Sequence, residues 1–247
     1  MKTGAEIKRY YDEFSKSTLL GDFRSVNLRQ QAIKRLCDRF IAPGASVLEI
    51  GCGAGIVSKH IAKRASRLVG IDISETAVAM ARLYATGGNC EFRALDITGE
   101  AVDTTSLGTF DAILMPDVIE HIPVARRRGL FARIESLLGP RGLVLLTYPS
   151  PEYQEYLRRE KPENLQVVDE TVELSGILAE TSLRPVYFSY IDAGERNQYV
   201  HLALRPAAEY SPERPPVGPA ARIARPARKT LWRLRNAAFL RKVRNVI

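Results

Sequence analysis

Three glycines at alternate positions, Gly51, Gly53 and Gly55, form the strongest chemical signal in the sequence. They follow an apolar run at residues 47–50 and precede an amphipathic segment at residues 56–65. This order predicts a buried strand, a tight turn and the start of a helix. Glycine lets a ligand press against peptide groups, and the start of a helix offers unpaired N–H groups. We therefore expect this turn to bind an electron-rich ligand.

Two details of the turn indicate which kind of ligand it binds. Glu49 lies inside the end of the predicted strand, where a charge is costly unless it is paired. Ile56 stands where a dinucleotide-binding fingerprint would carry its last glycine. Residues 47–55 resemble motif I of the class I S-adenosylmethionine (SAM) dependent methyltransferases. The resemblance implies that SAM is the cofactor and that the turn contacts it through Glu49, Gly51, Cys52, Gly53 and Gly55.

Carboxylates follow the next two predicted strands. Asp72 comes twenty-one residues after Gly51, and a carboxylate at this place can accept hydrogen bonds from both hydroxyls of a ribose. Ile73 follows it and belongs to the same predicted site. In the resembling family the residue at Asp96 faces the adenine amino group, and Ile97 lies beside the ring. The alternative for Asp96 is a plain helix cap, because aspartate is a favoured capping residue.

The fourth predicted strand ends at Pro116-Asp117, and Glu120-His121 follows within one short turn. The resemblance extends the SAM site to Pro116 and Asp117. Methyl transfer to a hydroxyl benefits from a general base, and histidine titrates near neutral pH. Similar Glu-His pairs occur in ubiquinone-type O-methyltransferases and in sugar methyltransferases. We predict His121, with Glu120, as the catalytic pair; the alternative is that both residues only cap or pack the following helix.

The N-terminal region supplies a predicted cap for the cofactor. Tyr11 and Arg29 resemble residues that cover the methionine end of SAM in this superfamily, and Arg29 could pair bidentately with its carboxylate. Arg24 is an equal contender for that pairing. No core helix is expected within residues 1–25, because the aromatic cluster there is short and polar.

The predicted acceptor site lies later in the chain. Residues 148–170 contain Tyr148 and Tyr153 and are expected to form much of the pocket. Strand alternation puts Tyr199 and His201 on one face of a late strand, which can meet the acceptor. The alternative for His201 is a histidine satisfied within the core.

The spacing of these elements predicts the fold. Strands expected at residues 46–50, 68–71, 90–95, 110–115 and 142–147 alternate with helices expected at 28–40, 56–66, 75–85, 123–138 and 171–180. Such alternation indicates a parallel sheet with helices on both faces. Residues 186–191 and 198–204 predict an antiparallel hairpin with Gly194 in its turn. We expect a seven-stranded, Rossmann-like α/β sheet at residues 26–205, an N-terminal cap segment at 1–25, and a linker with a basic tail at 206–247.

The net charge of +8 is concentrated in that tail. Ten of the 36 basic residues follow Glu213 and no acidic residue does, so the rest of the chain is slightly acidic. Residues 229–247 are either a solvated extension or a helix that lies on an anionic membrane surface. Nucleic-acid binding is disfavoured, because the main body lacks a basic surface interleaved with aromatic residues.

The three cysteines and three histidines have no spacing typical of a disulfide framework or a metal site. No window reaches the roughly 20 apolar residues of a membrane-spanning helix, and the N-terminus does not resemble a signal peptide. We expect a cytoplasmic protein, peripheral at the inner membrane face if the tail binds lipid.

We predict SAM-dependent methyl transfer to an oxygen of a small molecule or sugar, with a glycan or lipid-linked glycan favoured. The acceptor and the oligomeric state are not readable from the sequence. Among the rivals, a nicotinamide-dependent dehydrogenase disagrees with Ile56 and Glu49. A non-catalytic SAM-binding scaffold, or a binding module that acts through the basic tail, is the remaining alternative.

Overall fold

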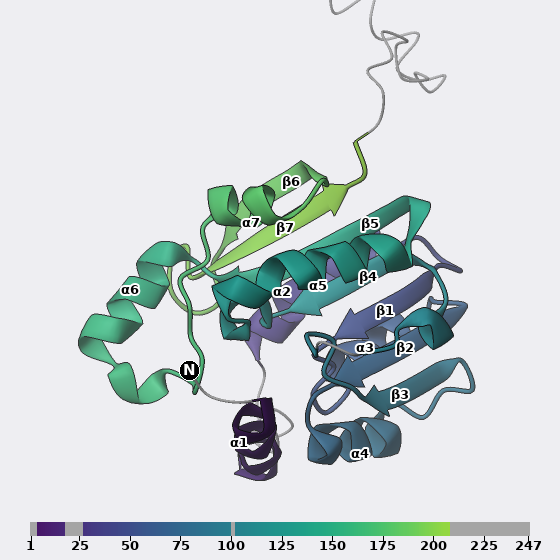
Figure 1. Ribbon diagram of the computed structural model, residues 1–247, viewed down its shortest axis with the longest axis horizontal. Helices are drawn as coiled ribbons and strands as arrows, with labels where there is room; N and C mark the ends of the chain where they lie inside the picture. The colour runs from purple at the N-terminus through teal and green to yellow at the C-terminus, as the bar shows by residue number, and fades with distance from the viewer. Residues whose placement is uncertain (1–3, 18–26, 100–101, 208–247) are drawn as a thin grey trace, which may run out of the picture. The chain divides into compact units, whose positions relative to one another are not determined.

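A single seven-stranded sheet organises the chain in the computed structural model, which describes residues 4–17, 27–99 and 102–207 (Figure 1). The strands are β1 (Ser46–Ile50), β2 (Arg67–Asp72), β3 (Cys90–Ala94), β4 (Phe110–Pro116), β5 (Leu138–Pro149), β6 (Arg184–Ile191) and β7 (Tyr199–Arg205). Their order is β3-β2-β1-β4-β5-β7-β6. Strands β1 to β5 pair in parallel, and β7 is antiparallel to both β5 and β6. The predicted Rossmann-like sheet with its C-terminal antiparallel hairpin is confirmed.

Helices cover both faces of this sheet. They are α1 (Gly4–Ser17), α2 (Leu28–Phe40), α3 (Ile56–Ile61), α4 (Glu75–Tyr84), α5 (Val124–Leu137), α6 (Pro151–Glu160) and α7 (Leu174–Glu180). In the part of the chain that the structure describes, the connections contain the short 3₁₀ turns η2 (Thr105–Leu107), η3 (Ile119–His121) and η4 (Pro162–Asn164).

Alternate residues of the strands separate the core into two layers. Leu48 of β1 packs in a cluster with Phe131 of α5 and Ile177 of α7 on one face. Its neighbour Val47 packs with Ile33 of α2 on the other face. Because side chains alternate across a strand, a strand buried on both faces needs the continuous apolar run that predicts it.

Side-chain caps set the start of two helices where the sequence predicted them. Asn27 accepts a hydrogen bond from the amide of Gln30 at 3.1 Å and begins α2. Ser74 accepts from the amide of Ala77 at 3.1 Å and begins α4. Both side chains satisfy an amide that the first helical turn leaves unpaired.

Several elements differ from the prediction. The helix after the glycine turn ends at Ile61, several residues earlier than expected, and β5 begins at Leu138 instead of residue 142. Helices α1 and α6 were not predicted at all. Both are polar along most of their length and bury few side chains, so they lack the broad apolar face by which a core helix is recognised; α6 nevertheless carries the local signal of Ser150 as N-cap followed by proline.

The chain divides into a compact unit of residues 1–207 and a second unit of residues 208–247. Apart from residues 206 and 207, the predicted linker and basic tail lie outside the described residues, as does the contender Arg24. Within the described ranges, no helix is long and apolar enough to cross a membrane.

Burial of His201 in β7 predicts that the fold loses stability in mild acid. The side chain is 4% exposed, and burial lowers the pKa of His201 to about 4. The unfolded chain takes up this proton near pH 6.5, so stability falls as the pH drops from 6.5 towards 4, by about 2 kcal/mol at pH 5. Urea unfolding of His201→Gln and the wild type across this range should show a flatter pH dependence in the variant. Parallel curves would show that His201 is not buried in its neutral form.

Candidate functional site

One large cavity, of about 510 Å³, lies where β1, β2 and β4 end, and α1 and α2 contribute to its wall. The sheet order places β2 on one side of β1 and β4 on the other, so the chain changes direction here. Open α/β sheets bind ligands at such a switch point, beyond the carboxyl ends of the strands. Most of the site residues predicted from the sequence line this cavity.

The glycine turn forms the floor of the cavity. Gly51 has a φ of +76°, and a Cβ at this position would lie 2.2 Å from Cγ2 of Val118. Gly53, also left-handed, donates its amide to Asp72 Oδ2 at 2.9 Å. Gly55 lies outside the cavity wall; a Cβ there would lie 3.0 Å from Cα of Ala81 in α4. Gly51 and Gly53 therefore expose backbone to a ligand, whereas Gly55 permits close packing of two helices.

An acidic residue is tolerated at the buried end of β1 because its side chain is mostly uncharged. Glu49 is 1% exposed and accepts a hydrogen bond from Ser58 Oγ at 2.5 Å. Burial raises the pKa of Glu49 to about 8, so the side chain is mostly a neutral acid at pH 7. Cys52 and Ile73 line the same part of the cavity and make its wall more apolar.

Asp72 is held rigidly at the end of β2. Its Oδ1 accepts from the amide of Ser74, and its Oδ2 from the amide of Gly53, each at 2.9 Å. A carboxylate has about four acceptor positions, so lone pairs remain for ligand hydroxyls. With Ile73, Leu95 and Ile97 on the neighbouring wall, the site fits the nucleoside half of SAM.

Asp96 also reaches the cavity, but its side chain is engaged locally. Oδ1 accepts from the amide of Thr98 at 2.9 Å and from Thr98 Oγ1 at 2.6 Å. This is the geometry of an aspartate turn, and since no helix begins directly after Asp96 among the described residues it is not the helix cap that the sequence left open. The contact of Asp96 with the adenine stays a prediction. Ile97, 5% exposed, follows it on the cavity wall.

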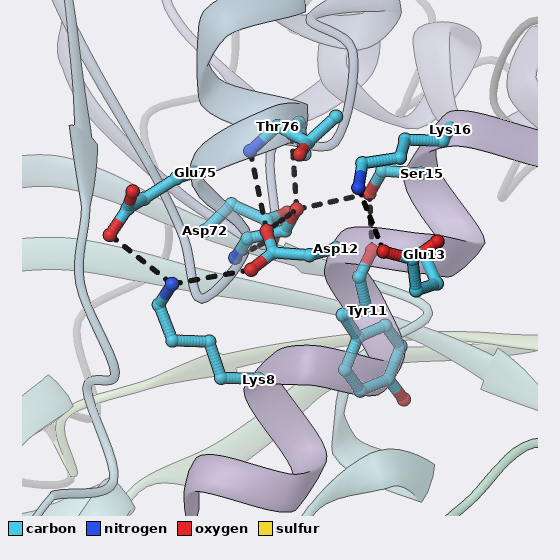
Figure 2. A network of polar contacts seen from close by, with 11 residues as sticks. Lys8, Tyr11, Asp12, Glu13, Ser15, Lys16, Asp72, Glu75 and Thr76 are labelled. Atoms are coloured by element: carbon cyan, nitrogen blue, oxygen red, sulfur yellow. Dashed lines mark hydrogen bonds and ion pairs between the residues drawn. The ribbon is translucent and has the colours of Figure 1, made fainter.

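A network of polar contacts holds helix α1 against the side of the cavity that contains Asp72 (Figure 2). Asp12 Oδ1 accepts from Ser74 Oγ at 2.7 Å and from the amide of Thr76 at 3.3 Å. Lys8 Nζ lies 3.2 Å from both Asp12 Oδ2 and Glu75 Oε1. The acidic side chain of Asp12 thus meets the positive N-terminal end of α4, which stabilises the contact.

The opposite side of the cavity contains a partly exposed ion pair between Arg29 and Asp117. Asp117, directly after β4, adopts a φ of +54°, which is unusual for a residue with a side chain. Its Oδ2 lies 3.1 Å from Arg29 Nη1, and its Oδ1 accepts from Thr147 Oγ1 at 2.7 Å. Arg29 also donates to Tyr199 Oη at 3.4 Å. Pairing of Arg29 with the methionine carboxylate of SAM stays a prediction, because Asp117 occupies the guanidinium here.

The predicted catalytic pair lies on η3, beside this ion pair. His121 Nδ1 is 2.8 Å from the carbonyl oxygen of Val168. Glu120 is 2% exposed, its Oε1 lies 3.9 Å from His121 Nε2, and its Oε2 has no partner among the described residues. Burial, followed by the charge of Asp117, raises the pKa of Glu120 well above its usual value. Both side chains line the cavity together with Tyr11, whose ring centre is 6.0 Å from that of His121.

The predicted acceptor residues divide into two groups. Tyr153 and Tyr199 line the cavity, and their ring centres are 6.2 Å apart. The structure does not bring Tyr148 or His201 to the cavity wall: they are 1% and 4% exposed and lie in β5 and β7. Strand β5 continues to Pro149, which keeps Tyr148 within the sheet and packs its ring into the core.

Two cavity residues from α1, Ile7 and Phe14, were missed by sequence reasoning, because no core helix was expected there. Leu157, Asn164, Gln166 and Asp169 also line the cavity, and they belong to residues 148–170, the segment that the sequence assigned to the acceptor pocket. The helical start at Ser150-Pro151 was the available signal for α6, and nothing local marks the connection. Within the described residues there is no cluster of His, Cys, Asp or Glu that could hold a metal ion.

Comparison with known sequences identifies the domain. A family model described as a methyltransferase domain matches residues 25–185. The ubiquinone biosynthesis O-methyltransferase of Pseudomonas aeruginosa is 28% identical over 156 residues, which cover 63% of this chain and 64% of the relative. The corresponding protein of Stutzerimonas stutzeri is 35% identical over 80 residues, 32% of this chain and 34% of the relative. The matches thus span about one third to two thirds of these relatives.

Solved structures share the fold at low sequence identity. The magnesium protoporphyrin IX methyltransferase of Synechocystis PCC 6803, with bound S-adenosylhomocysteine, superposes with a TM-score of 0.63 at 18% identity, over 83% of this chain and 99% of that one. The N-methyltransferase NodS of Bradyrhizobium japonicum, in complex with the same molecule, superposes with a TM-score of 0.59 at 20% identity, over 73% and 86% of the two chains.

The position of Asp72 leads to a prediction about SAM binding. Asp72→Ala removes a buried carboxylate acceptor from the cavity and should weaken SAM binding by about 2 kcal/mol, roughly 30-fold. Isothermal titration calorimetry measures this directly, with Asp111→Ala as a control, since Asp111 lies at the opposite end of the sheet and is bonded to Ser46. Equal SAM affinity in Asp72→Ala and the wild type would rule out the predicted ribose contact.

Proposed function

The chain belongs to the class I SAM-dependent methyltransferases, and we propose that it methylates a hydroxyl oxygen of a small, flat acceptor with His121 as the general base. One observation carries the proposal: the contact of 2.8 Å between His121 Nδ1 and the Val168 carbonyl. A carbonyl oxygen can only accept, so Nδ1 must carry the hydrogen. The lone pair of the neutral ring then lies on Nε2.

The surroundings of His121 suit a base that works near neutral pH. Burial lowers the pKa of His121, whereas the bond to Val168 and the charges of Asp169 and Asp117 act in the opposite direction. The ring is thus neutral before the reaction and ready to accept a proton from a hydroxyl. Once it has accepted one, the two carboxylates stabilise the imidazolium.

Glu120 is suited to a different role from that of a second base. Because burial and Asp117 raise the pKa of Glu120, the neutral acid form of its side chain is favoured, and this form can donate a hydrogen bond. The unpartnered Oε2 is therefore available to hold an oxygen of the acceptor beside His121.

When bound, SAM supplies an activated methyl group on its sulfonium. The residues proposed to hold it are those of the cavity floor and the adjoining strand ends: Tyr11, Arg29, Glu49, Gly51, Cys52, Gly53, Asp72, Ile73, Asp96, Ile97, Pro116 and Asp117. Gly55 contributes indirectly: because it has no side chain, α3 can pack closely against α4. The fastening of α1 onto α4 keeps water away from this side of the cavity.

Aromatic side chains on the acceptor side favour a planar molecule. Tyr11, Tyr153 and Tyr199 line the cavity, and flat rings pack well against such walls. The names of the ubiquinone O-methyltransferase relatives support oxygen as the methylated atom. The name of NodS keeps nitrogen as the alternative. A glycan or lipid-linked glycan, favoured by the sequence, has no support from these comparisons and stays a prediction.

Turnover of His121 variants tests the proposal. His121→Asn keeps an N–H group near the position of Nδ1 but offers no base, so methyl transfer should slow about 100-fold while SAM affinity is nearly unchanged. Transfer of labelled methyl from SAM to a panel of phenols, hydroxyquinones and sugars measures the rate and identifies the acceptor class; calorimetry measures the affinity. Full turnover in His121→Asn would exclude the base, and no turnover with any acceptor would favour a SAM-binding scaffold.

Membrane contact through residues 229–247 is a further prediction from the sequence. A basic helix with Trp232 at the interface should bind anionic vesicles, with each arginine adding about 1 kcal/mol of attraction. Co-sedimentation of the full chain with phosphatidylserine vesicles, against a version ending at Ala208, tests this contact. If both proteins remain in the supernatant at low salt, the tail does not bind membranes.

A further inference from the structure

The connection between α6 and α7 lies against the turn that carries His121, and two hydrogen bonds join them. The amide of Glu170 donates to the carbonyl oxygen of Glu120 at 2.8 Å, and His121 Nδ1 donates to the carbonyl of Val168 at 2.8 Å. The position of the Val168 carbonyl therefore decides which ring nitrogen of His121 carries the hydrogen.

The side chain of Asp169 shapes the backbone around that carbonyl. Its Oδ2 accepts from the amide of Gln166 at 3.1 Å, which closes a turn over residues 166–169. Its Oδ1 accepts from Nε2 of Gln154, a fully buried residue of α6. Val168 lies inside this turn and directly precedes Asp169, so these bonds restrain the peptide that carries its carbonyl.

Arg158 of α6 holds the same stretch from its far side. Nη2 donates to the carbonyl oxygen of Asp169 at 2.8 Å, and Nη1 bonds to Thr171 Oγ1. The connection is thus bonded to α6 through the side chain and the backbone carbonyl of Asp169 and through the side chain of Thr171.

Asp169 also contributes charge to the cavity. It is one of the carboxylates that favour the protonated form of His121; Asp117 of the β4 end acts in the same direction, and Arg29 of α2 opposes both. The other titratable groups that face the ring are Glu120 and Tyr11, and burial raises the pKa of each. Burial thus favours the neutral form of both, and Asp169, Asp117 and Arg29 are the charges that act on the ring.

We propose that Asp169 is a positioning residue for His121: it holds the Val168 carbonyl against Nδ1 and leaves Nε2 as the basic nitrogen. The role of this nitrogen in the reaction rests on the proposed function, whereas the control of the tautomer does not. Asp169 acts through Val168 and through its charge, without accepting the proton itself.

The decisive experiment is imidazole ¹⁵N NMR of the full chain labelled in histidine, recorded against pH without acceptor. The wild type should show His121 as the Nδ1–H tautomer, and His121→Asn identifies its signals. Asp169→Asn replaces one of the two acceptor oxygens by an amide donor, so the side chain can no longer accept from Gln166 and Gln154 through separate oxygens, and it removes the charge. The tautomer ratio should shift about fivefold towards Nε2–H, and the pKa of His121 should fall by about half a unit.

Two further variants separate geometry from charge and from general effects. Gln154→Leu removes one hydrogen-bond partner of the Asp169 side chain and keeps the charge of Asp169. The tautomer ratio of His121 should therefore shift, while the pKa of His121 falls less than in Asp169→Asn. This variant also tests the inference if Asp169→Asn does not fold. Glu163→Gln changes an exposed carboxylate of the same connection and should alter neither quantity. An unchanged tautomer ratio in folded Asp169→Asn or in Gln154→Leu overturns the inference.

The outcome is distinguishable from failure of the proposed function. If His121→Asn turns over normally but Asp169→Asn shifts the tautomer, His121 is not the base and Asp169 still positions it. If His121→Asn is inactive and the tautomer is unchanged in Asp169→Asn, the base assignment stands and the role of Asp169 is refuted.

Discussion

The close approach of the Gly51 backbone to Val118 is the constraint on which the rest of the site depends. Val118 belongs to the turn after β4, and a side chain on Gly51 would occupy the space of its methyl group. The contact holds the cofactor floor and the turn with Glu120 and His121 at a fixed separation. Methyl transfer requires such a separation, because donor and acceptor must meet in line within a narrow range of distance.

Buried carboxyl groups give the cavity its electrostatic character. Glu49 and Glu120 are driven towards their neutral forms by burial, and Asp72 has both oxygens bonded to backbone amides. Asp117 is paired with Arg29. A wall with several acidic residues is therefore less negative than its composition suggests, and it can accommodate the cationic sulfonium beside an apolar surface without attracting excess water.

The cavity is completed by two helices that contribute little to the core. Helix α1 is attached mainly through the polar contacts of Asp12 and Lys8 with the start of α4. Helix α6 holds the connection to α7 through Gln154 and Arg158. Because the contacts of Lys8 are exposed to solvent and therefore weaker than the packing of the sheet, α1 is the part of the site that we expect to adjust when an acceptor enters.

The sequence by itself determined the sheet, the helices that begin after Asn27 and Ser74, and the cofactor turn. Continuous apolar runs identify strands buried on both faces, Asn27 and Ser74 mark helix starts, and glycines at 51 and 53 have φ values that other residues avoid. Each of these signals is local, so it can be recognised without knowing what lies opposite it in space.

Only the tertiary structure decided which polar residues share the cavity. Tyr148 and His201 have side chains suited to an acceptor site, yet strand pairing buries both in the sheet. No local sequence signal marks Asp169. It matters because it is bonded to Gln154 of α6, while the adjacent Val168 is bonded to His121 in the turn after β4. The side chain of Arg29 pairs with Asp117, which is distant from it in the sequence. Such contacts depend on how the connections fold over the strand ends, which hydrophobic periodicity does not specify.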